Sequence, residues 1–146
     1  MVETLVRGRA AGAVDRSVQR AVAARLRRAL RELGRARSSA TLVFTDDDEI
    51  RALNRRYRRH DRATDVLSFH LQELEGEDDP RGDGAALGDI VISVETARRR
   101  AAGKRLPAEL HRLAIHGLCH LFGHDHKRRP EADVMFALER RLRRAK

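Results

Sequence analysis

The chain has 146 residues, which is long enough for one hydrophobic core, and we expect a single domain over residues 1–146. Its single cysteine cannot form an internal disulfide or a Cys-rich zinc site. Residues 1–13 contain no apolar signal-peptide core, and no apolar run reaches the roughly 18 residues of a membrane span. We therefore expect a protein of the reducing cytoplasm with no membrane partner.

The formal net charge of +9 favours a nucleic-acid partner, because Lys and Arg neutralise phosphates. Lysine occurs only at positions 104, 127 and 146, and a chain so rich in arginine and alanine also fits a codon bias. A more specific signal is the group of arginines in one short segment: Arg51, Arg55, Arg56, Arg58, Arg59 and Arg62. With four Phe, one Tyr and no Trp, aromatic platforms that stack bases are not expected.

The first half of the chain predicts two strands and two helices. In order, they are a weak strand at 4–6, an amphipathic helix over 14–33 that Gly34 ends, a buried strand at 40–44 and a helix that carries Tyr57. Thr45 is predicted to cap this last helix, with the acidic residues 46–49 in its first turn. The acidic run therefore indicates a helix start and not a metal site.

The second half predicts two more strands and three helices. They are strands at 66–69 and 89–93 separated by a mobile acidic loop over 73–84, a short helix from Ser93 to about residue 102, a helix beginning at Pro107 and a last helix from Pro130. This order of elements predicts an α+β fold in which a small mixed sheet is covered by helices.

Three histidines in the C-terminal third have the spacing of a metal site. His116 and His120 lie four residues apart, so on a helix both project from one face, roughly one turn of 5.4 Å apart. Gly123 can adopt the left-handed conformation that ends a helix, and the chain can then return His126 to the same point. Three histidine ligands leave one tetrahedral position open, which is typical of a catalytic zinc.

The same spacing occurs in the metzincin peptidases, where a glutamate after the first histidine is the general base. Gly117 occupies that position here and has no proton acceptor, so peptidase chemistry is disfavoured. His124 could replace or supplement a ligand, but the spacing places it one position off, so we expect it beside the ligands and not among them. Asp125 either orients a ligand histidine or is an ordinary turn residue. Cys119 falls on another face of the helix and is expected in the core.

Three segments follow one another in the chain: LNRRYRRHDRATDVLSFH at 53–70, LGDIVIS at 87–93 and HGLCHLFGHDH at 116–126. Together they resemble the YbeY family of bacterial endoribonucleases, whose motifs read LNxxYRxxDxPTDVLSFP, LGDIxIS and HGxLHLxGYDH. The departures are Ala63 and His70 in place of proline, Cys119 in place of an aliphatic residue and His124 in place of tyrosine.

The resemblance implies a fold of four strands and about five helices with the zinc helix at the centre. It further implies a zinc-dependent endoribonuclease that acts on single-stranded rRNA in 3′-end maturation of the small ribosomal subunit and in ribosome quality control, with the ribosome or its factors as partners. Two other functions remain open at this point. One is a zinc peptidase or similar hydrolase, and the other is a non-catalytic ribosome-associated zinc protein.

The resemblance also assigns roles to particular residues. His116, His120 and His126 would bind one Zn²⁺ per chain, and Arg58 would hold a phosphate or stabilise charge in the transition state. Residues expected to contact substrate are Asn54, Arg55, Arg59 and Ser68. The nucleophile is either a zinc-activated water or the RNA 2′-OH.

Overall fold

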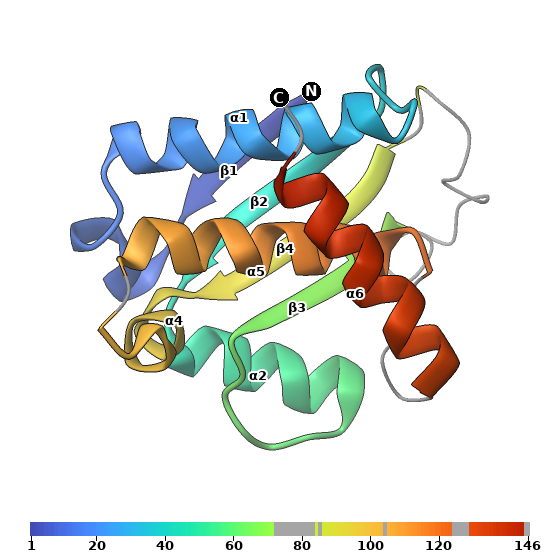
Figure 1. Ribbon diagram of the computed structural model, residues 1–146. Helices are drawn as coiled ribbons and strands as arrows, with labels where there is room; N and C mark the ends of the chain where they lie inside the picture. The colour runs from blue at the N-terminus through green and yellow to red at the C-terminus, as the bar shows by residue number, and fades with distance from the viewer. Residues whose placement is uncertain (72–83, 85, 104, 124–128, 145–146) are drawn as a thin grey trace.

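The computed structural model in Figure 1 describes residues 1–71, 84, 86–103, 105–123 and 129–144. In chain order its elements are β1 (Val2–Val6), η1 (Gly8–Gly12), α1 (Arg16–Glu32), β2 (Ser39–Thr45), α2 (Asp47–Arg58), β3 (Val66–His70), β4 (Ala86–Ser93), α4 (Val94–Ala101), α5 (Leu106–Leu121) and α6 (Arg129–Arg143). The loop expected over 73–84 lies outside the described residues except for Gly84.

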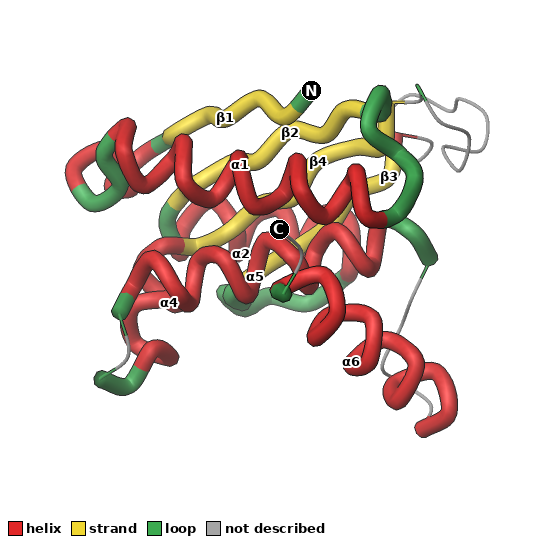
Figure 2. Tube along the Cα trace, turned by 45° about the horizontal axis from the view of Figure 1, so that its top comes forward, coloured by secondary structure: helices red, strands yellow, loops and turns green. Residues whose placement is uncertain are grey.

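The four strands form one mixed sheet in the order β1-β2-β4-β3 (Figure 2). Strands β1, β2 and β4 are parallel, and β3 pairs antiparallel with β4 at one edge. The predicted α+β fold with a small mixed sheet and about five helices is therefore confirmed. Of the helices in the described part of the chain, none is both long and apolar enough to cross a membrane.

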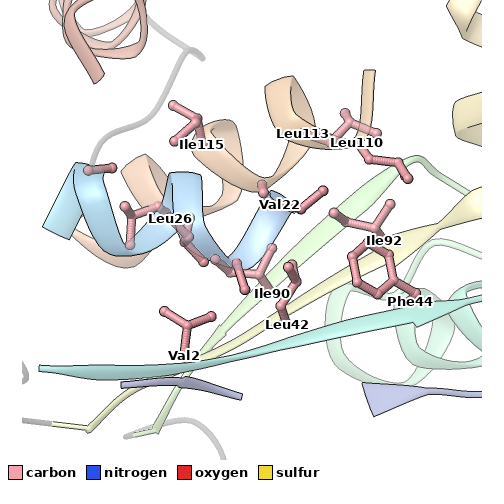
Figure 3. Close-up of a cluster of buried hydrophobic side chains, with 14 of the residues drawn as sticks. Val2, Val22, Leu26, Leu42, Phe44, Ile90, Ile92, Leu110, Leu113 and Ile115 are labelled. Carbon is pink, nitrogen blue, oxygen red and sulfur yellow. The ribbon is translucent and has the colours of Figure 1, made fainter. Parts of the chain in front are cut away.

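The core lies on both faces of the sheet because side chains alternate along the central strands. Leu42, Phe44, Ile90 and Ile92 point toward helices α1 and α5, which lie side by side on one face (Figure 1, Figure 3). Val43 and Val91 point the other way and pack with Ile50 of α2. The predicted central position of the histidine-bearing helix is correct, since α5 contacts α1, α4, α6 and the sheet.

Side-chain caps and glycines set several helix ends. Asp46 caps α2 by accepting a hydrogen bond from Glu49 N at 3.0 Å, so the predicted cap at Thr45 is wrong by one residue. The physical reason is that Asp46 follows the last residue of β2 and also accepts from Arg9 N, while Thr45 is fully buried at the strand end. Gly34 and Gly123 both adopt left-handed backbone conformations after α1 and α5, as predicted.

Gly88 in β4 is the glycine of the LGDIVIS segment, and its conformation explains why a glycine is needed there. Its φ is +139°, and a Cβ atom there would lie 2.0 Å from the carbonyl oxygen of Phe69 on the neighbouring strand. The pairing of β2 with β4 also shifts register near this point, between Ser39 and Thr41. Only glycine fits this conformation and this spacing, so Gly88 allows β3 to lie directly against β4.

Candidate functional site

The site is centred on two histidines near the end of α5. The Nε2 atoms of His116 and His120 lie 3.1 Å apart, and their rings meet edge to face with centroids separated by 4.7 Å. Two nitrogen ligands of one tetrahedral zinc, each about 2.05 Å from the metal, are about 3.3 Å apart. The two Nε2 atoms therefore converge at nearly the separation that a shared metal ion requires.

Glu139 of α6 orients one of these rings. His116 Nδ1 donates to Glu139 Oε1 across 2.5 Å, and the glutamate is only 7% exposed. Since Nδ1 carries the proton in this bond, Nε2 keeps its lone pair for a metal, which is the usual carboxylate–histidine–metal arrangement. The donor set thus fits a divalent metal with imidazole ligands.

The sequence interpretation missed Glu139, although the chain contains a signal for it. Glu139 stands between the core residues Leu138 and Leu142, beside arginines at 140, 141 and 143. An acidic residue is unusual among the apolar residues that face the core from a helix. A buried carboxylate needs a partner, and among the described residues the neighbouring arginines of this helix do not supply one. That partner is His116, on a different helix.

The remaining candidate ligands are not placed by the structure. His124, Asp125 and the predicted third ligand His126 lie outside the described residues. Among the residues that are described, no three His, Cys, Asp or Glu side chains gather into a metal-binding group. Cys119 is completely buried, and burial is the main cause that raises the pKa of its thiol to about 12. A thiol that remains protonated at neutral pH is a core residue, as expected.

Gly117 is required by close packing of α5 on the sheet. A Cβ atom at this position would lie 2.6 Å from Ile90 Cγ2 and 3.0 Å from Ser68 Oγ. The Ser68 hydroxyl donates a 2.7 Å hydrogen bond to the Gly117 carbonyl oxygen. A glutamate side chain does not fit here, so the position of the peptidase general base is closed by β3 and β4.

Arg58 reaches this region from the other face of the sheet. It is the last residue of α2, and its Nη2 donates to the backbone carbonyl oxygen of Ser68 at 2.8 Å. Its guanidinium also lies over the Phe69 ring, 5.0 Å from the centroid. Ser68 therefore contacts Arg58 through its carbonyl and the histidine helix through its hydroxyl. The edge strand β3 thus contacts both Arg58 and the histidine-bearing helix, the two parts of the site expected from the sequence.

The other candidate substrate residues divide into a buried amide and two exposed cations. Asn54 is 5% exposed, and its Nδ2 donates to the Arg62 carbonyl oxygen at 2.9 Å while its backbone carbonyl oxygen accepts from His60 N. It thereby fixes the loop after α2. Arg55 and Arg59 are exposed on the surface, and Arg59 ends α2 in a left-handed conformation with φ of 59°.

Comparisons with known proteins show which family the chain matches. The sequence model of a family described as Endoribonuclease YbeY matches residues 9–145. A protein called Endoribonuclease YbeY from Anaeromyxobacter dehalogenans (strain 2CP-C) is 47% identical over 118 residues, which cover 80% of this chain and 58% of that protein. One of the same name from Anaeromyxobacter sp. (strain Fw109-5) is 46% identical over 132 residues, covering 89% and 66%.

A third relative of that name, from Myxococcus xanthus (strain DK1622), is 49% identical over 105 residues, covering 70% of this chain and 34% of its own length. The chain thus spans between about a third and two thirds of the length of these curated relatives. The solution structure of TM1509 from Thermotoga maritima has a similar fold, with a TM-score of 0.65 and 22% identity, over 98% of this chain and 87% of that one.

Proposed function

The chain belongs to the YbeY family of endoribonucleases, and from this we propose that it cleaves single-stranded RNA with the help of a metal ion. The substrate we propose is rRNA, cut during 3′-end maturation of the small ribosomal subunit and in ribosome quality control. That role would give the protein ribosomal partners and a place in the cytoplasm.

The metal would be one Zn²⁺ per chain, held by His116 and His120 together with His126. Bound there, it would polarise a phosphate oxygen or activate a water molecule. The described residues support this through the convergence of two Nε2 atoms to 3.1 Å and through Glu139, which holds the His116 proton on Nδ1. Both features suit a metal that prefers imidazole nitrogen.

Arg58 would act on the phosphate that is being cleaved. A guanidinium presents its N–H donors in a planar fork that matches two phosphate oxygens, and it keeps its charge at any physiological pH. The Ser68 carbonyl and the Phe69 ring fix the plane of this fork beside the edge strand. An oriented positive group of this kind stabilises the negative charge that grows in the transition state of phosphoryl transfer.

One observation carries the proposal. Ser68 is hydrogen-bonded both to Arg58 and to Gly117, and Gly117 directly follows His116. The cationic group and the paired imidazoles are therefore held by one strand residue. The packing of Gly117 against Ile90 argues against a peptidase, because it leaves no room for a general base.

A parallel incubation tests the proposal. Purified zinc-loaded protein is given single-stranded RNA, the same sequence as double-stranded RNA, and casein. We expect cleavage of the single strand only, and we expect a chelator to abolish it. Cleavage of casein would replace this function with that of a peptidase. Cleavage of none of the three would favour a non-catalytic zinc protein.

A further inference from the structure

A second cationic feature lies at the opposite end of α5 from the histidine pair. A pocket of about 280 Å³ opens between α1 and the start of α5. Its lining residues are Ala21, Val22, Arg25, Arg105, Pro107, Ala108 and His111. At 1.5 Å per residue along α5, the lining residues Arg105 and His111 precede His116 by about 17 Å and about 7.5 Å. Of the described residues, neither His116 nor His120 lines the pocket.

Cationic side chains line part of the pocket, beside apolar residues. Arg25 and Arg105 line it, and Arg28 of α1 and Arg143 of α6 are close enough to act on His111 electrostatically. Burial first, and then the charges of Arg25, Arg143 and Arg28, lower the pKa of His111 to about 4. Among the described residues that line the pocket, none is acidic. An anion placed here would meet positive charge from three helices.

These arginines differ from many others in the chain because no described residue pairs with them. Within the described ranges, the side chains of Arg25, Arg28, Arg105 and Arg143 make no ion pair or hydrogen bond. By contrast, Arg9 pairs with Asp48 and Glu95, and Arg112 pairs with Glu109. Arg25 and Arg105 line the pocket, and Arg28 and Arg143 act on its residue His111, so an anion bound here would be attracted by positive charge that is not already paired.

The pocket wall itself is also incompletely satisfied. His111 Nε2 is buried and has no hydrogen-bond partner among the described residues. The helix begins at this wall without a side-chain cap, and its Pro107 supplies no N–H group. The first turn of α5 carries Glu109, but this carboxylate pairs with Arg112 and does not line the pocket.

We propose that this pocket binds a backbone phosphate of the RNA substrate, at a distance from the cleavage site. This inference rests on the proposed function. Guanidinium groups bind phosphate oxygens in pairs, and phosphate is the anion that a basic chain of this kind meets on RNA. A chain of successive phosphates suits this arrangement, because one phosphate can lie between Arg25 and Arg105 in the pocket while its neighbours meet the charges of Arg28 and Arg143.

The test compares two double variants that remove equal charge. The double variant Arg25→Gln with Arg105→Gln removes the charge of both arginines that line the pocket. Arg16→Gln with Arg27→Gln removes two exposed arginines of α1 that do not line it. Binding of a fluorescent 2′-O-methyl single-stranded oligoribonucleotide, about 16 nucleotides long to match the larger single-strand sites, is measured by anisotropy over a range of salt.

We expect the pocket variant to bind at least about tenfold more weakly and to show a shallower salt dependence, by about 0.7 in the logarithmic slope for each phosphate that the protein no longer neutralises. The control variant should bind less than about threefold more weakly, as expected for charges that only add to the general field. Equal weakening in the two variants would overturn the inference. So would an unchanged affinity in the pocket variant.

A second arm separates RNA from free phosphate. Inorganic phosphate is titrated into the wild-type protein while the His111 ring is followed by NMR. A saturable shift in wild type, together with unchanged oligonucleotide affinity in the pocket variant, would assign the pocket to small anions and overturn the RNA form of the proposal. Binding and cleavage are measured separately, so the two proposals can fail independently. If the wild-type protein does not cut RNA but the pocket variant still binds RNA more weakly, the proposed function is refuted and the phosphate site in the pocket stands.

Discussion

His116 and Glu139 lie 23 residues apart in sequence, yet His116 Nδ1 and Glu139 Oε1 are 2.5 Å apart. The contact joins α5 to α6, which pack against each other beside α1. It fixes one imidazole so that its other nitrogen faces that of His120. The C-terminal helix therefore contributes to the site as well as to the core.

Replacing Glu139 with Gln should weaken metal binding about 10- to 100-fold, because the amide is a poorer acceptor for the Nδ1 proton and leaves the ring less basic. Competition with a chromophoric chelator measures this affinity. Glu32→Gln is the matched control, since Glu32 is an exposed glutamate whose partner is Arg141 at 3.2 Å. Equal affinity in Glu139→Gln and wild type would show that the contact does not serve the metal.

Gly117→Ala should destabilise the fold by about 1–3 kcal/mol, the usual cost of adding a methyl group to a packed interface. The new Cβ would lie 2.6 Å from Ile90 Cγ2, so α5 must move away from the sheet. Urea unfolding measures the change. Gly12→Ala is the control, because nothing lies within 4 Å of a Cβ there. If both variants unfold at the same urea concentration, the close approach of α5 is not required.

Arg58→Ala should slow single-turnover RNA cleavage by about 10²- to 10³-fold, the typical effect of removing one donor to a transition-state charge. Metal content should be unchanged. Arg58→Lys should recover little, since an ammonium cannot reproduce the planar fork held by the Ser68 carbonyl. Arg55→Ala, which removes an exposed cation of the same helix, should mainly weaken binding. A normal single-turnover rate in Arg58→Ala would reduce Arg58 to a binding residue.

His111 should make stability depend on pH between about 6.5 and 4. Burial and the charges of Arg25, Arg143 and Arg28 lower the pKa of His111 to about 4 in the folded protein. Between about pH 4 and about pH 6.5, therefore, the unfolded chain binds a proton at His111 that the folded chain does not bind. Stability from this group is complete above the unfolded pKa of about 6.5 and falls as the pH drops toward 4. Urea unfolding at several pH values should therefore show a weaker dependence in His111→Gln. An identical dependence in both proteins would contradict this.

Much of the fold follows from local sequence. The strands at the centre of the sheet are predictable because their buried residues are continuous, as in Leu42–Phe44 and Ile90–Ile92. β1 gives a weaker signal because it is an edge strand on which Val2 is buried while Leu5 stays 43% exposed. The capping error at Thr45 arose because two adjacent residues can both cap a helix, and only tertiary contacts with Arg9 decide between them.

The site was less predictable than the fold. Local spacing places His116 and His120 on one helical face, but it carries no information on which helix crosses that face, so Glu139 could not be identified as a partner. Ser68 was expected to contact substrate, whereas the structure engages both its hydroxyl and its carbonyl in internal bonds. Such roles depend on the packing of β3 against both α2 and α5, and α5 lies far from β3 in sequence.

Metal reconstitution tests the central claim most directly. The protein is stripped with a chelator, Zn²⁺ is added back in steps, and cleavage of a single-stranded RNA is followed beside an identically treated His120→Ala variant. We expect activity to rise linearly and to stop rising at one Zn²⁺ per chain, with no recovery in the variant. If the stripped protein or His120→Ala cleaves RNA at the rate of the reconstituted wild type, the histidine pair is not the catalytic metal site.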